Sequence, residues 1–267
     1  MKHAIEKGSA WALVTGASSG IGLQIAHQLA GLGYNLAIVS RDDNALARAQ
    51  QQIATEHGIE VRRLTLDLVD RDAATKLHDW TSSQRLEIEI LVNNAGAFSF
   101  LDVTESSPER IEQLIGLHVV TPTLTCRLYG AEMVRRGHGR ILNMSSYSIW
   151  MPLPGLALYS ASKDYLKNFS RAFAKEVREH GVTVTAVCPA GVATDLYGLP
   201  RNLQRFGCRI GVLITARKCA RQALRAMFRG RKVFVPAGWV RIFVPILSML
   251  PRPITDFARR HTMRFQK

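Results

Sequence analysis

The chain of 267 residues contains only four cysteines, and no two of them stand in a Cys-x-x-Cys spacing. We therefore expect Cys126, Cys188, Cys208 and Cys219 to be reduced thiols in a cytoplasmic setting. The first ten residues lack the apolar run of a secretory signal peptide, which agrees with that expectation. We also expect no metal site.

Long apolar stretches are also absent from the sequence, and acidic residues are scarce in its C-terminal quarter. The longest late apolar run, residues 239–250, carries Arg241 and Pro245 and falls short of the about 20 residues that a membrane-spanning helix needs. Residues 201–267 hold 16 lysines and arginines against one acid, Asp256, so the excess positive charge of the chain, +14 in total, lies in this segment. Such a segment suits an anionic membrane, a phosphate-bearing ligand or a solvated helix face. We expect no nucleic-acid partner, because no aromatic-and-basic motif accompanies the charge.

Short β-branched runs alternate with longer helical patterns along the chain. The predicted strands are 11–15, 35–40, 61–65, 88–93, 140–144, 182–188 and 232–235, and the predicted helices are 20–32, 43–57, 70–84, 108–137, 157–180 and 215–229. This alternation predicts an α/β fold, a single Rossmann-type domain over 1–267 with a doubly wound parallel sheet of about seven strands and helices on both faces. Within it, we expect residues 195–213 to form a substrate lid and 231–267 a basic, apolar C-terminal extension.

A glycine-rich turn, TGASSGIG at residues 15–22, follows the first predicted strand. In such a turn one glycine permits a tight bend, another lets backbone approach a pyrophosphate, and a third lets the helix pack on the strand. The following helix would direct its N-terminal N–H groups and dipole at the phosphates. Gly16, Gly20 and Gly22 therefore predict a dinucleotide site.

The end of the second strand distinguishes NAD from NADP, because an acid there would bind the ribose 2′-hydroxyl and repel a 2′-phosphate. Here the strand runs into Ser40 and Arg41, a hydroxyl and a guanidinium that suit a phosphate. Asp42 and Asp43 are better placed to begin the next helix. We expect the cofactor to be NADP(H), with NAD(H) as the weaker alternative. If Arg41 binds no cofactor, it is an ordinary surface residue of the loop.

Four further segments stand in order behind the predicted strands: NNAG (93–96), NMSS (143–146), YSASK (159–163) and CPAGVAT (188–194). Together with the glycine-rich turn, over residues 10–195, this set resembles the short-chain dehydrogenase/reductase family. The resemblance implies that Asn93 also lines the cofactor. The cofactor-binding residues it implies are Gly16, Ser18, Ser19, Gly20, Ile21, Gly22, Ser40, Arg41, Asp67, Leu68, Asn94, Ala95, Gly96, Tyr159, Lys163, Pro189, Val192 and Thr194.

Tyr159 and Lys163 share one helix face at i and i+4. A phenol of pKa near 10 is a poor base, and a nearby ammonium lowers that pKa toward the range useful for acid–base catalysis. The resemblance implies that Tyr159 passes the proton, that Lys163 also holds the nicotinamide ribose, and that Ser146, 13 residues before the tyrosine, holds the substrate oxygen. Ser145 is the weaker choice for that oxygen. The alternative is that Tyr159 and Lys163 have no catalytic role and belong to an ordinary half-buried helix face.

His118 stands where the family usually has a catalytic asparagine whose main-chain carbonyl binds a relay water. Pro122 has no N–H and cannot donate to the carbonyl of residue 118. We hypothesise that Pro122 supplies the kink and the free carbonyl while the imidazole replaces the asparagine amide. The alternative is a satisfied core histidine with the relay altered or lost.

The segment 147–158 is almost wholly apolar, and we expect Trp150, Met151 and Leu153 to line a hydrophobic slot or to pack on a neighbour. The expected function is interconversion of a carbonyl and an alcohol on a lipophilic substrate of sterol, retinoid or long-chain acyl type. The alternatives are a 3-oxoacyl-thioester reductase and a non-catalytic cofactor-binding regulator or scaffold.

Arg221, Arg225 and Arg229 recur at i+4 spacing and would form a basic stripe for peripheral membrane contact or for acyl-CoA phosphates. The resemblance further implies a homodimer or homotetramer that pairs through the helices at 108–137 and 157–180.

Overall fold

The computed structural model describes residues 6–151 and 153–236. The predicted extension 231–267 therefore lies outside the described residues from 237 onward. The central sheet is built from β1 (Trp11–Thr15), β2 (Asn35–Ser40), β3 (Val61–Thr65), β4 (Ile88–Asn93), β5 (Gly139–Met144), β6 (Val182–Val187) and β9 (Val233–Phe234). Its order is β3-β2-β1-β4-β5-β6-β9, and every neighbouring pair is parallel.

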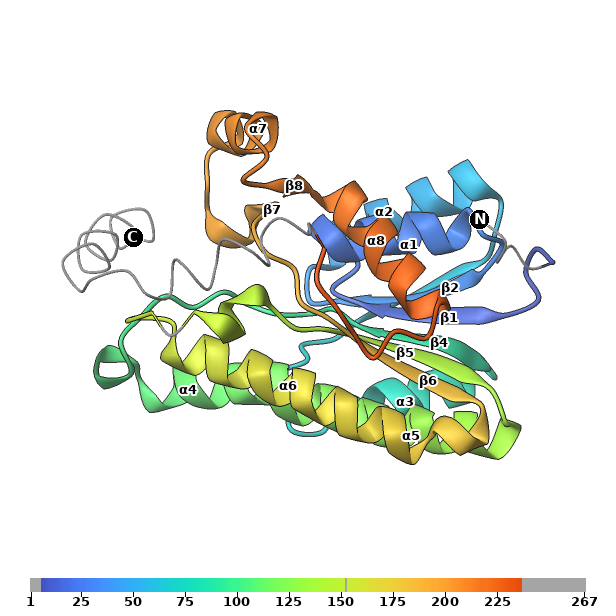
Figure 1. The fold of residues 1–267 in the computed structure, drawn as a ribbon. Coiled ribbons are helices and arrows are strands. Elements are labelled where there is room, and N and C mark those ends of the chain that lie inside the picture. The colour runs from blue at the N-terminus through green and yellow to red at the C-terminus, as the bar shows by residue number, and fades with distance from the viewer. Residues whose placement is uncertain (1–5, 152, 237–267) are drawn as a thin grey trace.

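Helices cover both faces of this sheet, as the alternation predicted (Figure 1). The helices α1 (Gly20–Ala30), α2 (Asp43–His57) and α8 (Ala216–Phe228) lie on one face, and α3 (Ala73–Ser83), α4 (Pro108–Ile115), α5 (Thr121–Arg136) and α6 (Ala157–Glu176) lie on the other. Two buried clusters fill the layers, one under α1, α2 and α8 and the other under α3, α5 and α6. Because the strands are buried on both faces, their sequences are nearly continuous apolar runs.

One predicted helix is interrupted in the structure. The predicted helix 108–137 divides into α4 and α5, with a π-helical turn, Gly116–Val120, between them. In that turn the Thr121 N–H donates to the carbonyl of Gly116, five residues back. The interruption is therefore a widened turn just before Pro122, which then enters the first turn of α5, where a missing N–H costs little.

The other differences are at element ends and in the predicted lid. α3 begins at Ala73 rather than 70, and α6 ends at Glu176, four residues short of the predicted 180. The segment 195–213 contains a 3-10 turn (Asp195–Tyr197) and a helix, α7 (Arg201–Arg209), which the sequence did not predict. A short parallel ribbon of β7 (Val192–Ala193) and β8 (Ile214–Thr215) joins the two ends of this segment. Its role as a lid stays a prediction.

All four cysteines are free thiols, three of them buried and Cys208 partly exposed, in line with the reduced state expected. Within residues 6–151 and 153–236, no helix combines the length and apolar character that crossing a bilayer requires.

Candidate active site

The sheet order reverses between β1 and β4, and a cleft of about 1470 Å³, its open mouth included, lies at the carboxyl ends of the strands there. Parallel α/β sheets bind ligands at such a point, because the loops on either side diverge. Apart from Gly22 and Asn93, every predicted cofactor-binding residue lines this cleft, and so does Ser146. Ser145, the weaker candidate for the substrate oxygen, lines it as well, and the lining adds residues that the sequence did not single out: Leu66, Val69, Ala97, Leu117, Met144, Asp195 and Leu196.

The glycine-rich turn lies close against the loop after β4. Gly16 has φ +65°, and a Cβ there would lie 2.9 Å from the Cα of Ala95. Gly22 does not line the cleft: a Cβ on it would lie 2.1 Å from the carbonyl oxygen of Gly16. Its expected role in cofactor contact is therefore corrected to a packing role, since any side chain would separate α1 from the turn.

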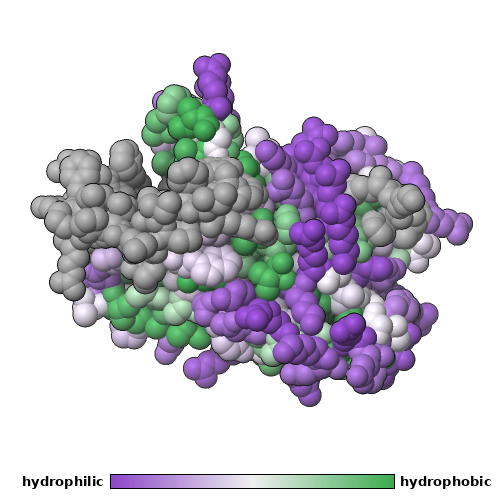
Figure 2. All heavy atoms as spheres, viewed as in Figure 1, coloured by the Kyte–Doolittle hydropathy of each residue, from purple (hydrophilic) through white to green (hydrophobic). Residues whose placement is uncertain are grey.

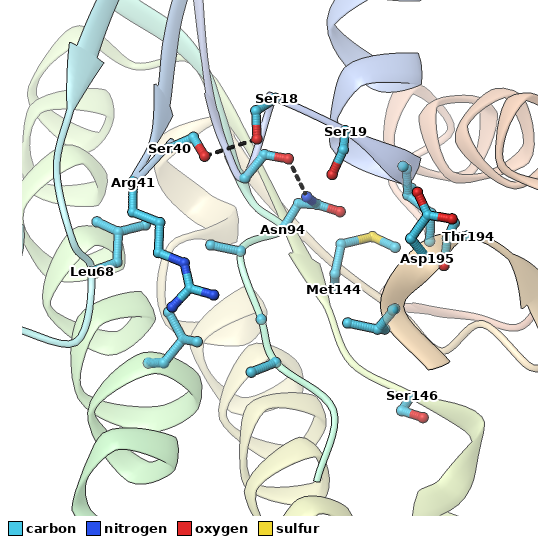
Figure 3. A pocket seen from close by; sticks show the side chains of 18 of the residues that line it. Ser18, Ser19, Ser40, Arg41, Leu68, Asn94, Met144, Ser146, Thr194 and Asp195 are labelled. Carbon is cyan, nitrogen blue, oxygen red and sulfur yellow. Dashed lines mark hydrogen bonds between the residues drawn. The ribbon is translucent and has the colours of Figure 1, made fainter. Parts of the chain in front are cut away.

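The NNAG loop is hydrogen-bonded to the same turn. The Asn94 amide donates to the carbonyl of Gly16 at 3.3 Å (Figure 3) and to that of Thr15 at 3.0 Å. The Thr15 hydroxyl accepts from the Asn94 N–H at 3.0 Å. Asn93 was expected to line the cofactor, but its amide donates at 2.9 Å to Asn143 and its oxygen accepts from Thr125 at 2.9 Å. A buried strand residue alternates its direction with its neighbours, so Asn93 faces the helices and Asn94 the cleft.

Ser40 and Arg41 lie at one side of the cleft, and Ser146 and Thr194 at the other (Figure 3). The Ser40 hydroxyl lies 2.8 Å from that of Ser18, and the exposed Arg41 guanidinium extends into the cleft beside Leu68.

The acids that follow Arg41 do not contribute to this end of the cleft. Asp42 caps α2 by accepting from the Ala45 N–H at 2.9 Å, and Asp43 binds Thr65 and Arg63. The cleft therefore presents two hydroxyls and a guanidinium there, a donor set that fits a phosphate.

The two serines of the NMSS motif have different partners. The Ser145 hydroxyl donates to the backbone carbonyl of Lys163 at 2.7 Å, which ties β5 to α6. Ser146 accepts from the Ser148 N–H at 3.1 Å and is hydrogen-bonded to the phenol of Tyr159. Ser146 and Tyr159 together can therefore present two hydroxyls to one substrate oxygen, whereas Ser145 is occupied by the backbone.

Tyr159 and Lys163 are both buried at the base of the cleft. Burial raises the pKa of the Tyr159 phenol above its ordinary value, and the Ser146 hydrogen bond only partly opposes it. This corrects the expectation of a lowered phenol pKa. Burial also lowers the pKa of Lys163 to about 8, and its ammonium donates to the Met144 carbonyl at 3.0 Å. In both groups burial is the largest cause of the pKa shift.

His118 lies behind Gly96, with both ring nitrogens in hydrogen bonds. Its Nε2 accepts from the Ala97 N–H at 3.1 Å, so Nδ1 carries the proton and donates to Ser162, 3.0 Å away. Burial, and then the positive charges of Lys163 and Arg110, hold the pKa of His118 well below its ordinary value. The imidazole is therefore neutral, and it fastens the loop after β4 to α6. Together with Lys163 and Pro122, it also lines a small separate cavity.

The apolar segment after Ser146 packs rather than lining the cleft. Trp150 lies against Tyr147, with ring centroids 4.8 Å apart, and Lys167 lies over its ring. Met151 joins the cluster of Tyr147 and Cys188, and Leu153 joins a cluster around Tyr159. The predicted slot of Trp150, Met151 and Leu153 is thus corrected, and Ala97, Leu117 and Leu196 supply apolar cleft surface.

Two functional contacts had weak sequence signals. Ser162 lies inside the YSASK motif, but its bonds to His118 and to the Tyr159 carbonyl at 2.8 Å depend on the packing of α6 against the π turn. Ala97 contacts His118 through its backbone N–H, and no side-chain pattern reveals that bond.

Known proteins resemble this chain in sequence and in fold. A sequence profile described as short chain dehydrogenase matches residues 10–201. The very-long-chain 3-oxoacyl-CoA reductase of Homo sapiens is 36% identical over 191 residues, which is 70% of this chain and 60% of that protein. The very-long-chain 3-oxoacyl-CoA reductase of Pyrenophora tritici-repentis is 36% identical over 66% of this chain and 53% of its own length.

A solved short-chain dehydrogenase from Sphingobium yanoikuyae in complex with NADPH superposes with a TM-score of 0.79 at 27% identity, covering 96% of this chain and 95% of that one. This chain spans only about 60% of the first curated relatives it matches. The profile match, the reversal of strand order at the cleft and the Ser146, Tyr159 and Lys163 cluster agree, and the chain belongs to the short chain dehydrogenase family.

Proposed function

We propose that this protein is an NADP(H)-dependent oxidoreductase that interconverts a carbonyl and an alcohol on a lipophilic substrate. The observation that carries the proposal is the hydrogen-bonded pair of Ser146 and Tyr159 at the base of the cleft, beside the buried Lys163. Ser40, Ser18 and Arg41 support the choice of NADP over NAD, and the NADPH in the solved relative agrees with it.

In this proposal the chain positions and protonates the substrate oxygen. The nicotinamide, when bound, supplies the hydride for carbonyl reduction. Ser146 donates a hydrogen bond to the carbonyl oxygen, and the Tyr159 phenol, kept protonated by burial, gives that oxygen its proton. The Lys163 ammonium then faces a phenolate, which its charge stabilises.

Proton resupply requires a path from Lys163 to solvent. The small cavity lined by His118, Pro122 and Lys163 supports a site for a relay water beside Lys163. Because both imidazole nitrogens are occupied, His118 contributes its carbonyl and its position to this path rather than a titrating ring.

The substrate that we propose is a long-chain 3-oxoacyl thioester. The relatives named very-long-chain 3-oxoacyl-CoA reductases support this class, and so does the excess of arginine after residue 200, which suits the phosphates of an acyl-CoA. Sterols and retinoids are the competing lipophilic classes.

NADPH oxidation by the purified full chain, measured against 3-oxoacyl-CoAs of increasing length, a sterol ketone, retinal and small ketones, tests the proposal. We expect turnover that rises with acyl length and falls by about 10²–10⁴-fold in Tyr159→Phe. Tyr165→Phe, on the exposed face of α6, is the matched control and should keep the wild-type rate. If NADPH binds and no carbonyl is reduced, the chain is instead a cofactor-binding regulator.

We also propose peripheral contact with an anionic membrane, for a protein in the cytoplasm. Arg221, Arg225 and Arg229 are exposed, and α8 contains no acid. Figure 2 shows hydrophilic side chains in a band over α8 and hydrophobic ones gathered on α7, where Leu203 and Phe206 are exposed. In pelleting with phosphatidylserine vesicles, the triple Arg→Glu variant at these arginines should stay in the supernatant, and salt should release the wild type.

A homodimer through α4–α5 and α6 is the assembly that we propose. Ile115 on α4, Val120 in the π turn and Tyr165 on α6 are exposed large hydrophobic side chains, and burying them favours pairing. Light scattering of wild type and Tyr165→Asp checks this proposal: the wild type should have a dimeric mass and the variant a monomeric one. A monomeric wild type would contradict it.

A further inference from the structure

Two histidines and a glutamate gather on the surface between α1 and α2. His27 Nδ1 lies 3.3 Å from His57 Nε2 and 3.3 Å from Glu56 Oε2, and His57 Nε2 lies 3.7 Å from Glu56 Oε1. All three donor groups lie within 4.8 Å of one another. His27 and His57 are 30 positions apart in the sequence, so only the packing of the two helices brings their nitrogens together.

These separations are those of ligands around one tetrahedral metal ion. With metal–ligand bonds of about 2.0–2.1 Å, two tetrahedral ligand atoms lie about 3.3 Å apart. The same geometry places the centroids of two ligating imidazole rings about 5 Å apart and tilted to each other. The His27 and His57 rings have centroids 5.6 Å apart and an interplanar angle of 70°, so a metal would need little movement of either ring.

The surroundings of the cluster also favour a cation. His27 and His57 both lie in the last turn of their helices, where the partial charge of the unpaired carbonyls is negative. The side chains of His27 and His57 are 15% and 18% exposed and that of Glu56 is 55% exposed, so solvent reaches the cluster and can supply a fourth ligand.

We propose that His27, Glu56 and His57 form a binding site for a zinc-class divalent cation, with water as the fourth ligand. Two imidazoles and one carboxylate are a donor set that zinc accepts. The ion would join the C-terminal ends of α1 and α2. The N-termini of these helices follow the glycine-rich turn and Arg41, so the site is structural and lies at the opposite end of the helices from the cleft. The proposal revises the expectation that the chain has no metal site.

Calorimetric titration of the chelator-stripped full chain with ZnCl₂ tests the proposal, with thermal unfolding in parallel. We expect one ion per chain and a rise in Tm on binding. Loading with Co²⁺ should produce the visible absorption of a tetrahedral ion. His27→Asn, His57→Asn and Glu56→Gln should each weaken Zn²⁺ binding by at least about tenfold and abolish the Tm rise.

Two matched variants separate this site from other metal-binding groups. His78→Asn removes the histidine of another histidine–carboxylate pair, His78 with Glu132, and Cys208→Ser removes the least buried thiol. Both should titrate like the wild type. Glu56 is largely exposed, so Glu56→Gln should fold even if a histidine variant does not. Wild-type Zn²⁺ affinity in Glu56→Gln, loss of binding in Cys208→Ser, or no binding by the wild type would overturn the proposal.

Discussion

A hydrogen bond between the ring of His118 and the hydroxyl of Ser162 connects the π turn to α6. His118 Nδ1 lies 3.0 Å from Ser162 Oγ, and that hydroxyl donates at 2.8 Å to the carbonyl of Tyr159. The other ring nitrogen accepts the Ala97 N–H, so one neutral side chain fixes both the loop after β4 and the start of α6. We therefore propose that His118 is a positioning residue for Tyr159.

Replacing His118 should slow turnover through misplacement of Tyr159. We expect His118→Ala to lower kcat by about tenfold or more while changing KM for NADPH less, because misplacing a reacting group affects the transition state most. His118→Asn, which keeps a donor and an acceptor, should recover part of the rate. Steady-state kinetics with saturating NADPH measures both, and a wild-type kcat in His118→Ala would contradict the assignment.

Pro122→Ala tests the carbonyl of His118 separately. Alanine restores an N–H that can donate to that carbonyl, so we expect a lower kcat and a changed pH profile with little change in Tm. The measurement is kcat against pH beside the wild type. If the rate and the profile are unchanged, proton resupply does not use this carbonyl.

Acidification should destabilise the wild type more than a variant that lacks His118. The pKa of His118 in the folded chain lies well below 6.5, its value in the unfolded chain, so the unfolded state binds more protons as pH falls through 6.5. Stability is therefore full above 6.5 and declines below it, by at most about 1.4 kcal/mol per pH unit for this one group. Urea unfolding at several pH values measures this. The free energy of unfolding of His118→Asn should fall less steeply with decreasing pH than that of the wild type. His138→Asn, at an exposed position, should keep the wild-type dependence on pH.

Arg41→Ala should reduce the preference for NADPH. Loss of the charge-assisted bonds to a 2′-phosphate should raise KM for NADPH by about 10- to 100-fold and leave KM for NADH nearly unchanged. Arg48→Ala, on α2 and outside the cleft lining, is the control. Equal effects of Arg41→Ala on the two cofactors would assign Arg41 to the protein surface.

Gly22→Ala should lose both stability and cofactor binding. The added methyl would lie 2.1 Å from the Gly16 carbonyl oxygen, so α1 must shift away from the turn, at a cost of about 1–3 kcal/mol. Gly31→Ala, whose methyl would meet only ordinary contacts at 3.4 Å and beyond, is the matched control. Thermal unfolding and NADPH titration should show the loss in Gly22→Ala alone.

Periodicity and local chemistry predicted most of the fold. The strands at 11–15, 35–40 and 61–65 agree with β1, β2 and β3 to the residue, because strands buried on both faces are continuous apolar runs bounded by turn residues. Gly207 and Gly211 favoured a hinged lid over a helix at 201–213, and α7 exposes Leu203 and Phe206, so it lacks the buried apolar face that helical periodicity detects. The π turn was also hidden, because helical spacing over 108–137 does not reveal a shift in hydrogen-bond partners.

The amino-acid sequence by itself determined the order of strands and helices, the tight glycine turn and the placement of Ser146, Tyr159 and Lys163, since each depends on spacing along a few residues. Tertiary structure alone decided that Asn93 faces the helices, that burial raises the pKa of Tyr159, and that His27 lies beside His57. These three features depend on how distant elements pack and how much water they exclude, and neither quantity is set by local sequence.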